Sequence, residues 1–276
     1  MKKIVARLHR QWVSQKLRRL IDCEPIRFMR VGTENGGWVL PGHIVEAGGT
    51  AVCVGAGEDI SFDVELNRRG FRVYTLDPTP RAKKHVEAVL DAAFTGCKMP
   101  INHSSSDHYD LFGFDKNRFH FLNLGVWEEN TTMRFFAPRD ANHVSHSIVN
   151  LQKTDEYFEA RCVTMKSLSN LLNLREFTLL KIDIEGAEYA VLRSLTAHGP
   201  LPEALCVEFD ELLNPIDENH PDRISDSIGM LKDSGYKFAH LDHCNALFLL
   251  SKSPSRSLKR DKIPAWQCTL SGVACI

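Results

Sequence analysis

Carboxylates cluster where one apolar stretch of the chain ends, and their spacing could serve catalysis. The run LLKIDIEGAEYAVLRSL (179–195) begins like a buried strand, and Asp183 and Glu185 sit at alternate positions at its end. Gly186 allows a sharp turn, and Glu188 follows in the first turn of the predicted helix. In doubly wound sheets, ligands bind beyond the carboxyl ends of the strands. We therefore predict that Asp183 and Glu185 are catalytic residues at the edge of a parallel sheet.

Two charged residues of the same run have simpler interpretations. Glu188 would favour the positive end of the helix that it begins, where it could serve only as a cap. Lys181 could pair with a neighbouring acidic side chain. A merely structural role explains Lys181 adequately and Asp183 poorly, because a solvated carboxylate has no reason to interrupt an apolar run.

A glycine-rich turn with a distant carboxylate predicts a nucleoside site. The segment VGAGEDI places Gly55, Ala56 and Gly57 between a predicted strand and a helix, where the backbone can approach a ligand and free N–H groups are available. Asp77 ends the next strand, twenty residues after Gly57, which is the spacing of a carboxylate that binds ribose hydroxyls. An N-cap for the following helix is the alternative for Asp77.

The same turn favours S-adenosylmethionine over NAD. A dinucleotide motif would have a third glycine where this chain has Ile60, and Glu58 is negative where a pyrophosphate would lie. An NAD-dependent sugar-modifying oxidoreductase is one alternative, although the sequence has no Tyr-x-x-x-Lys pair. A non-catalytic nucleoside-binding scaffold is another, disfavoured by the retained carboxylates.

Proton removal from an acceptor hydroxyl needs a base or a metal ion. His243 in HLDHC is the candidate base because the ordinary pKa of histidine is near neutral. Asp183 and Glu208 end what should be adjacent strands, and Asp210 follows shortly after. These carboxylates are a candidate Mg²⁺ site, since Mg²⁺ is bound by a few carboxylates together with water.

Composition describes one soluble α/β domain with an acidic body. The chain has 276 residues, of which 43% are hydrophobic and 25% charged, and its net charge is −1. Residues 1–30 carry a net charge of +7 and residues 251–276 carry +4, so residues 31–250 carry −12. An acidic body argues against a nucleic-acid partner. Eight cysteines without a CxxC pair, and no signal-peptide pattern, favour the cytoplasm.

The N-terminal segment predicts an amphipathic helix with a basic face. Apolar residues recur from Ile4 to Ile21 at helical spacing. We expect this helix to dock on the body, or on a second subunit in a homo-oligomer. The alternative is that this helix contacts the anionic surface on the inner face of a membrane. We expect the helix to position the protein and to take no part in catalysis.

Strands and helices alternate from residue 50 onward, which predicts a parallel sheet covered by helices on both faces. One predicted strand is HFLNLGVW (120–127), and a later loop contains His143, His146 and Ser147. Before this alternation, two short strands are predicted around a turn at Asn35–Gly37. The chain closes with a predicted hairpin, YKFAHLDHCNALFLL, which adds one antiparallel strand. We divide the chain into a helix and β-hairpin extension (1–47), a main domain (48–252) and a tail (253–276).

The sequence resembles the FkbM-type methyltransferases, which use S-adenosylmethionine and have the class I methyltransferase fold. The most specific likeness is KIDIEGAEYAVLRSL, preceded by VTMKSLSNLL, and the segments VGAGEDISFD, VYTLDPTP and DHCNALFLL fit the same pattern. The likeness covers about residues 28–251. It implies a Rossmann-like, doubly wound, mostly parallel sheet of seven strands whose last strand is antiparallel. It also implies methyl transfer to an oxygen of a sugar, a glycan or a secondary metabolite.

The resemblance also implies roles for single residues. Gly55, Ala56, Gly57 and Asp77 would bind the cofactor, Asn123 and Gly125 would lie near its adenosine or methionine part, and Asp183 near its methionine end. One departure concerns the residues before the glycines. The family more often has an acidic residue there, whereas this chain has Cys53 and Val54, which leaves Glu58 to hold the methionine amine.

Overall fold

The computed structural model describes residues 2–22, 26–101, 107–136 and 154–251. The predicted tail (253–276) and a predicted loop with His143, His146 and Ser147 lie outside these residues.

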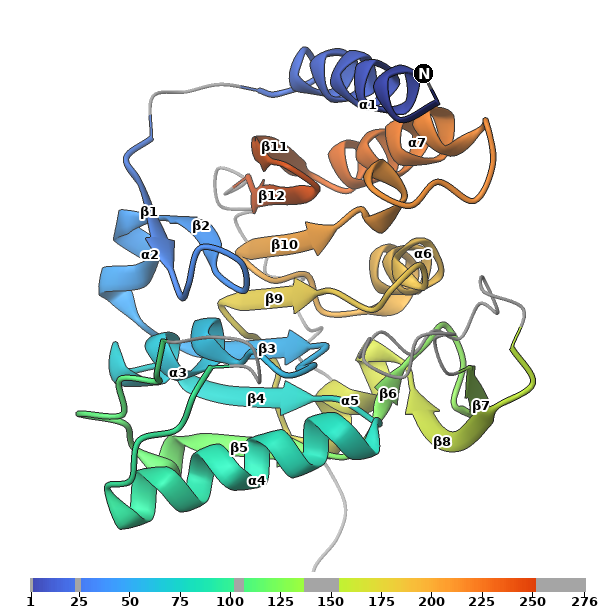
Figure 1. The fold of residues 1–276 in the computed structure, drawn as a ribbon. Coiled ribbons are helices and arrows are strands. Elements are labelled where there is room, and N and C mark those ends of the chain that lie inside the picture. The colour runs from blue at the N-terminus through green and yellow to red at the C-terminus, as the bar shows by residue number, and fades with distance from the viewer. Residues whose placement is uncertain (1, 23–25, 102–106, 137–153, 252–276) are drawn as a thin grey trace, which may run out of the picture.

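A seven-stranded sheet runs through the middle of the molecule (Figure 1). Its order is β11-β12-β10-β9-β3-β4-β5, and only β12 runs antiparallel to its neighbours. The doubly wound sheet with an antiparallel last strand is therefore confirmed. The strands are β3 (Thr50–Val54), β4 (Arg72–Leu76), β5 (Phe119–Leu122), β9 (Leu179–Ile182), β10 (Ala204–Glu208), β11 (Tyr236–Asp242) and β12 (Asn245–Leu250).

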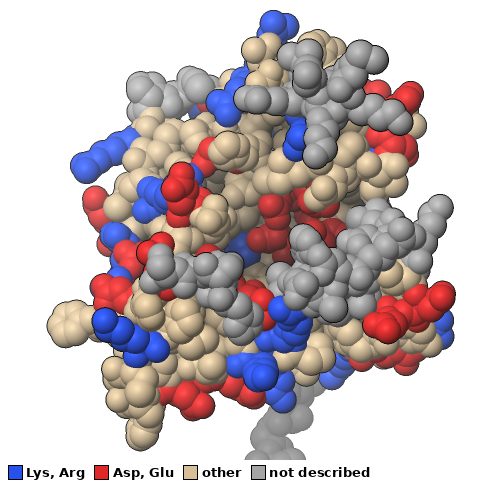
Figure 2. Space-filling view, in the orientation of Figure 1, with Lys and Arg blue, Asp and Glu red and all other residues tan. Residues whose placement is uncertain are grey.

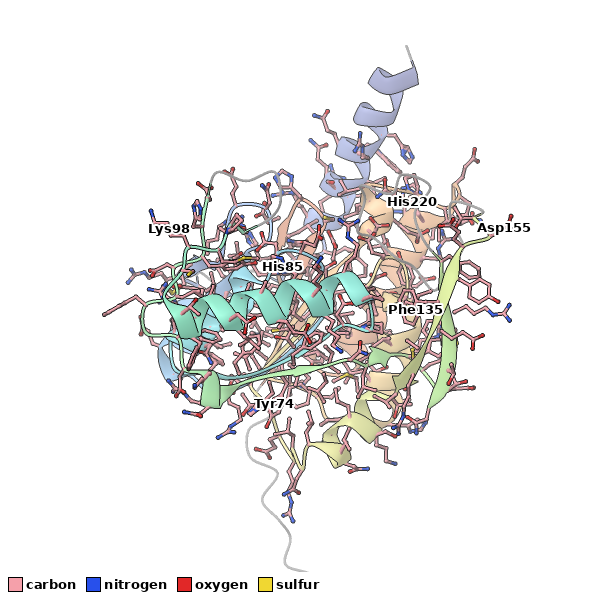
Figure 3. All side chains as sticks on the ribbon, turned by 60° about the horizontal axis from the view of Figure 1, so that its bottom comes forward. Tyr74, His85, Lys98, Phe135, Asp155 and His220 are labelled. Atoms are coloured by element: carbon pink, nitrogen blue, oxygen red, sulfur yellow. The ribbon has the colours of Figure 1, made fainter. Side chains whose placement is uncertain are left out.

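Helices cover both faces of this sheet, as the alternation of strands and helices predicts. Alternate strand residues point to opposite faces, so Leu180 and Ile182 belong to one apolar cluster and Leu179 to the other. Figure 3 shows α4 lying across one face. That face is covered by α2 (Gly42–Ala47), α3 (Ser61–Arg68) and α4 (Pro80–Thr95), and the other by α5 (Met165–Leu171), α6 (Glu188–His198) and α7 (His220–Asp233).

Two further sheets were predicted incompletely. The hairpin around Asn35–Gly37 is present as β1 (Phe28–Val31) and β2 (Trp38–Pro41), but the short helix α2 after it was not predicted. The predicted single strand over residues 120–127 is wrong. A tight turn, in which the Leu124 N–H donates to the Leu122 carbonyl at 2.9 Å, ends β5. The chain then enters a separate small sheet of β6 (Gly125–Val126), β7 (Thr131–Phe136) and β8 (Tyr157–Val163).

The N-terminal helix α1 (Lys2–Arg18) docks on the body beside α7 (Figure 1). Val13 and Leu17 are completely buried in the same apolar cluster as α7. The segment after the helix is held by Asp22, which pairs with Lys232 at 2.7 Å and accepts from the Phe238 N–H at 3.0 Å. Docking on the body is thus confirmed, while membrane contact and a homo-oligomer stay predictions. Among the helices of the described residues, none combines the length and apolar character needed to span a bilayer.

The docking of α1 can be tested with Leu17→Ala, which should lower the free energy of unfolding by about 2–4 kcal/mol because it leaves a cavity in the core. Urea denaturation measures the change. Trp12→Ala on the same helix is the control: Trp12 is 56% exposed, and its loss should cost about 1 kcal/mol or less. Equal effects of the two substitutions would show that α1 is not packed as described.

Candidate functional site

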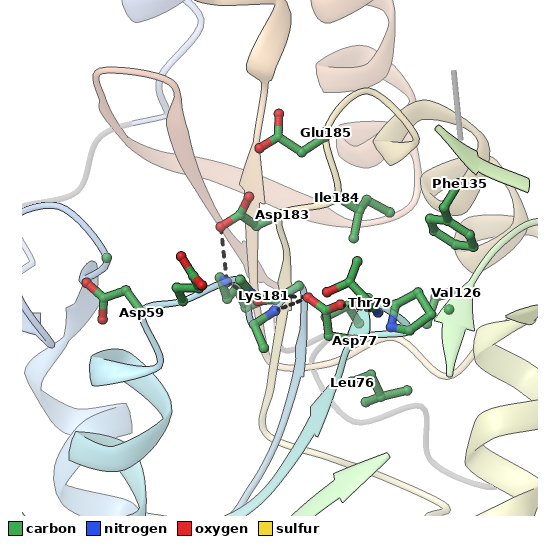
Figure 4. Close-up of a pocket in the computed structure, with 18 residues that line it drawn as sticks. Asp59, Leu76, Asp77, Thr79, Val126, Phe135, Lys181, Asp183, Ile184 and Glu185 are labelled. Carbon is green, nitrogen blue, oxygen red and sulfur yellow. Dashed lines mark hydrogen bonds and ion pairs between the residues drawn. The ribbon is translucent and has the colours of Figure 1, made fainter. Parts of the chain in front are cut away.

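A pocket of about 220 Å³ lies where β3, β4 and β9 end at their carboxyl edge (Figure 4). Figure 2, in the orientation of Figure 1, shows acidic side chains gathered in a hollow near the middle of the molecule. The pocket brings together most of the residues predicted for the site, namely Gly55, Ala56, Gly57, Glu58, Asp77, Gly125, Asp183 and Glu185. The predicted residues Asn123, Glu208, Asp210 and His243 are not part of its lining.

Glycine stands at the two positions of the turn for different physical reasons. Gly55 has φ +92°, and a Cβ there would lie 1.8 Å from the backbone oxygen of Asp183, so no other residue fits. Gly57 has φ +52°, and a Cβ there would meet nothing within 4 Å. Gly55 therefore lets the ends of β3 and β9 touch, whereas Gly57 leaves open space in the pocket wall where a ligand can approach the backbone.

Asp77 fixes the glycine loop from the side of β4. Its Oδ2 accepts from the N–H groups of Ala56 at 2.9 Å and Gly57 at 3.1 Å, and its Oδ1 accepts from the Thr79 N–H at 2.8 Å. The cap of α4 is Thr79, whose hydroxyl accepts from the Ala82 N–H at 3.3 Å, so the N-cap interpretation of Asp77 is wrong. Oδ1 retains a lone pair toward the pocket, and the ribose contact stays a prediction.

Glu58 has a partner that sequence analysis did not detect. The Arg81 guanidinium donates to both of its carboxylate oxygens, at 3.0 and 3.1 Å, and the Glu58 side chain is only 13% exposed. Such a bidentate pair fixes the carboxylate and compensates its charge. Glu58 lines the pocket, and its predicted hold on the methionine amine would have to share the carboxylate with Arg81.

Lys181 and Asp183 form an ion pair at the floor of the pocket. Lys181 Nζ lies 3.0 Å from Asp183 Oδ2 and donates to the Gly55 carbonyl at 2.6 Å. The pairing of Lys181 with a neighbouring acid is thus confirmed, and the residue also lines the pocket. Burial alone would raise the pKa of Asp183, but the Lys181 ammonium and a hydrogen bond with Glu208 hold it below its usual range.

Glu208 lies beside Asp183 because β9 and β10 run parallel with Ile182 opposite Val207. The negative charge of Asp183, together with burial, raises the pKa of Glu208 far above its usual range. Glu208 therefore carries a proton at neutral pH and donates it to Asp183 in a hydrogen bond. The Cys244 thiol in turn donates to Glu208 Oε1 at 3.1 Å.

The predicted Mg²⁺ site is not supported. Asp183, the first of the predicted ligands, is already paired with the Lys181 ammonium at 3.0 Å. Asp210 begins the short helix η2 (Asp210–Leu212) and accepts from the Asn214 amide at 2.9 Å. Across the described ranges, no group of three or more His, Cys, Asp or Glu side chains is placed to hold a metal ion.

The other predicted residues are placed as follows. His243 occupies the turn between β11 and β12 with φ +52°, and its side chain is 88% exposed. Glu185 lines the pocket with φ +55°. The Asn123 amide, with its nitrogen turned inward, donates to the carbonyls of Asp77 and Pro78, each at 3.3 Å. The roles assigned to these three residues stay predictions.

Glu188 does not cap its own helix, so its simpler interpretation is wrong: the N-cap of α6 is Ala187, and Glu188 bonds to the chain before the helix. Its Oε1 accepts from the N–H groups of Ile184 at 3.2 Å and Gly186 at 3.1 Å, and burial raises its pKa to about 8. These bonds fix the chain directly after Asp183, where the backbone turns into α6.

Some pocket residues were missed by sequence analysis. Gly36, in the loop between β1 and β2, lines the pocket next to Asp59, and Thr33 joins them: its hydroxyl donates to Asp59 Oδ2 at 3.0 Å and accepts from the Gly36 N–H at 2.9 Å. Phe135 enters from β7 of the small sheet and stacks on Phe158 with ring centroids 5.3 Å apart. Neither Gly36 nor Phe135 belongs to a local sequence motif of the site, because the residues that each one meets, Asp59 and Phe158, are distant in the chain.

Comparison with known proteins shows which family the chain belongs to. A model of the methyltransferase FkbM domain matches residues 52–236. The chain belongs to the FkbM methyltransferase family. Methyl transfer from S-adenosylmethionine is the general activity that an FkbM domain supports. The matched region contains every predicted site residue except His243. The hairpin loop with Gly36 lies before it.

Two other comparisons were made with the FkbM chain. No curated protein matches its sequence. A fibrillarin pre-rRNA processing protein of Methanococcus jannaschii has a TM-score of 0.38 and 11% identity, over 75% of this chain and 68% of that one. Precorrin-6y C5,15-methyltransferase from Geobacter metallireducens GS-15 has a TM-score of 0.35 and 10% identity, over 74% of this chain and 82% of that one.

The two glycines of the FkbM site should respond differently to alanine. Gly55→Ala should prevent folding or lower the free energy of unfolding by more than about 3 kcal/mol, since the new methyl group overlaps backbone. Gly57→Ala meets no atoms and should cost about 1–2 kcal/mol for its left-handed backbone. Thermal unfolding and calorimetric titration with S-adenosylhomocysteine measure both effects. A Gly57→Ala protein that is as unstable as Gly55→Ala would contradict this account.

Proposed function

We propose that this FkbM protein is an S-adenosylmethionine-dependent O-methyltransferase that acts on a hydroxyl of a sugar, a glycan or a secondary metabolite. The observation that carries the proposal is the meeting of the glycine loop, Asp77 and an ionised Asp183 around one pocket. The loop and Asp77 suit a nucleoside, and Asp183 suits the reacting groups.

The pocket has two chemically different parts that fit the cofactor. The apolar part lies beside Asp77 and suits a base, and it includes Leu76, Val126, Phe135 and Ile184. The opposite part carries the carboxylates of Asp59, Asp183 and Glu185. Negative charge there favours a sulfonium group and disfavours a pyrophosphate, which speaks against the NAD-dependent alternative. Asp77 would hold the ribose hydroxyls, and Gly57 would let the ligand approach the backbone.

When bound, the cofactor supplies a methyl group attached to a positively charged sulfur. Asp183 is ionised and has 31% of its side chain exposed, so it can accept a hydrogen bond from an acceptor hydroxyl and orient its oxygen. The hydroxyl loses its proton as the new oxygen–methyl bond forms, and Asp183 is placed to receive it. A depressed pKa suffices for this role, because the hydroxyl becomes strongly acidic as its oxygen is alkylated.

Cofactor identity can be tested by calorimetry. The protein should bind S-adenosylmethionine and its demethylated product, and NAD should not compete. Asp77→Ala should weaken binding at least about tenfold, because it removes hydrogen bonds both to the ribose and to the loop. Detection of NAD binding without S-adenosylmethionine binding would refute the proposal in favour of an oxidoreductase.

Catalysis can be tested with labelled methyl groups and an extract fractionated into glycans, lipids and small metabolites. On the fraction that becomes labelled, Asp183→Asn should lower turnover by about two to four orders of magnitude, with a smaller effect on cofactor binding. Glu208→Gln is the matched control. Its amide can donate to Asp183 as the protonated Glu208 does, so turnover should stay within about threefold.

Each outcome has a consequence for the function. Wild-type turnover by Asp183→Asn would remove Asp183 from catalysis. Cofactor binding without labelling of any fraction would favour the non-catalytic nucleoside-binding scaffold.

A further inference from the structure

Lys181 is a buried cation in a part of the core that would otherwise be neutral. It lies in the middle of the sheet on β9, 4% exposed, opposite Cys53 of β3 and Cys206 of β10. Both thiols are completely buried, and burial raises the pKa of each, so they stay uncharged at neutral pH. An ammonium group in such surroundings is costly unless its partners compensate the charge.

Two of its contacts lead to different elements of the site. The Lys181 ammonium donates to the Gly55 carbonyl at 2.6 Å, in the glycine loop, and lies 3.0 Å from the carboxylate of Asp183 (Figure 4). The loop is held from the other side by Asp77. The glycine loop is therefore fixed between a carboxylate from β4 and an ammonium from β9.

A second carboxylate lies behind Lys181, away from the pocket lining. Asp63 of α3 is 1% exposed and accepts hydrogen bonds from the Thr75 hydroxyl and from the Cys53 thiol. Its charge and that of Asp183 raise the pKa of Lys181, although burial lowers it. Asp63 helps to balance the charge of Lys181 without lining the pocket. The carboxylate that joins Lys181 to the site is instead Asp183.

We propose that Lys181 is a positioning residue that fixes the glycine loop and Asp183 relative to one another, so that cofactor and acceptor hydroxyl meet in line. The proposal rests on the proposed function and deepens it. Charge balance alone does not explain Lys181, because buried ion pairs can often be replaced by apolar residues without loss of stability. A residue kept only for balance would not need to reach two elements of the pocket.

The test separates charge balance from positioning in the full-length chain. Lys181→Met alone leaves Asp63 without its cation and should lower the melting temperature. Lys181→Met combined with Asp63→Asn removes the charges of Lys181 and Asp63 and retains the Thr75 hydrogen bond. Asp183 then loses its cation, but 31% of its side chain is exposed to water, so the double variant should melt near the wild-type temperature. Asp63→Asn alone is the matched control, since it retains Lys181. S-adenosylhomocysteine is titrated into each protein by calorimetry.

We expect the double variant to be stable yet to bind S-adenosylhomocysteine at least about tenfold more weakly, while Asp63→Asn binds within about threefold of wild type. The amides of Ala56 and Gly57 should also exchange their hydrogens faster in the double variant. A stable double variant with wild-type affinity and wild-type exchange would overturn the proposal and leave the proposed function intact. Failure of the wild type to bind would instead count against the proposed function.

A second apolar substitution at Lys181 is included in case the Met variant does not fold. Lys181→Leu in the Asp63→Asn background is made in parallel, and the affinity is taken from whichever double variant melts close to the wild type. If neither folds, Lys181 is a requirement of the core and not of the loop, and the positioning role is refuted.

Discussion

The contact between the end of β3 and the end of β9 is the constraint on which the site depends. The backbone at Gly55 comes so close to the Asp183 carbonyl that a methyl group on Gly55 would overlap it. The Asp183 N–H also donates to the Val54 carbonyl at 3.1 Å, so this contact continues the ladder of the parallel sheet. The glycine loop and Asp183, the carboxylate that we propose to be catalytic, are consequently neighbours through the backbone before any side chain is considered.

Electrostatics then decides what each carboxylate at this edge can do. Asp77 accepts backbone N–H groups, Glu58 is paired with Arg81, and Glu208 carries a proton that it shares with Asp183. Asp183 is left as the ionised carboxylate facing the pocket floor, held by Lys181. One strand edge thus contains carboxyl groups in several protonation and bonding states because their neighbours differ, although their side chains are chemically alike.

Two parts of the pocket lining come from segments that the family model does not cover or that lie outside the central sheet. Gly36 belongs to the hairpin before residue 52, and Phe135 belongs to the small sheet. The docking of the hairpin depends on the side chains of Thr33 and Asp59. These additions extend the lining of the pocket beyond the residues of the central sheet.

The sequence by itself determined the central fold and much of the pocket. Apolar strands that alternate with helices, a glycine turn after the first of them, and a carboxylate at the end of the next predicted the sheet and placed Gly55, Asp77 and Asp183 together. These features depend on local spacing and on the rule that parallel strands end at one edge, so the printed sequence is enough to read them. The single strand over residues 120–127 failed because the turn that ends β5 has no strong local signal.

Only the tertiary structure decided which chemical group each of these residues offers. The partner of Glu58, the proton on Glu208, the second contact of Lys181 and the exposed position of His243 depend on residues distant in the chain. The predicted Mg²⁺ site is not supported because sequence counts carboxylates at strand ends, whereas the described residues bring no three such groups together, and Asp183 is paired with Lys181 of its own strand. Protonation and pairing follow from distance and burial in three dimensions, which residue spacing along one chain does not contain.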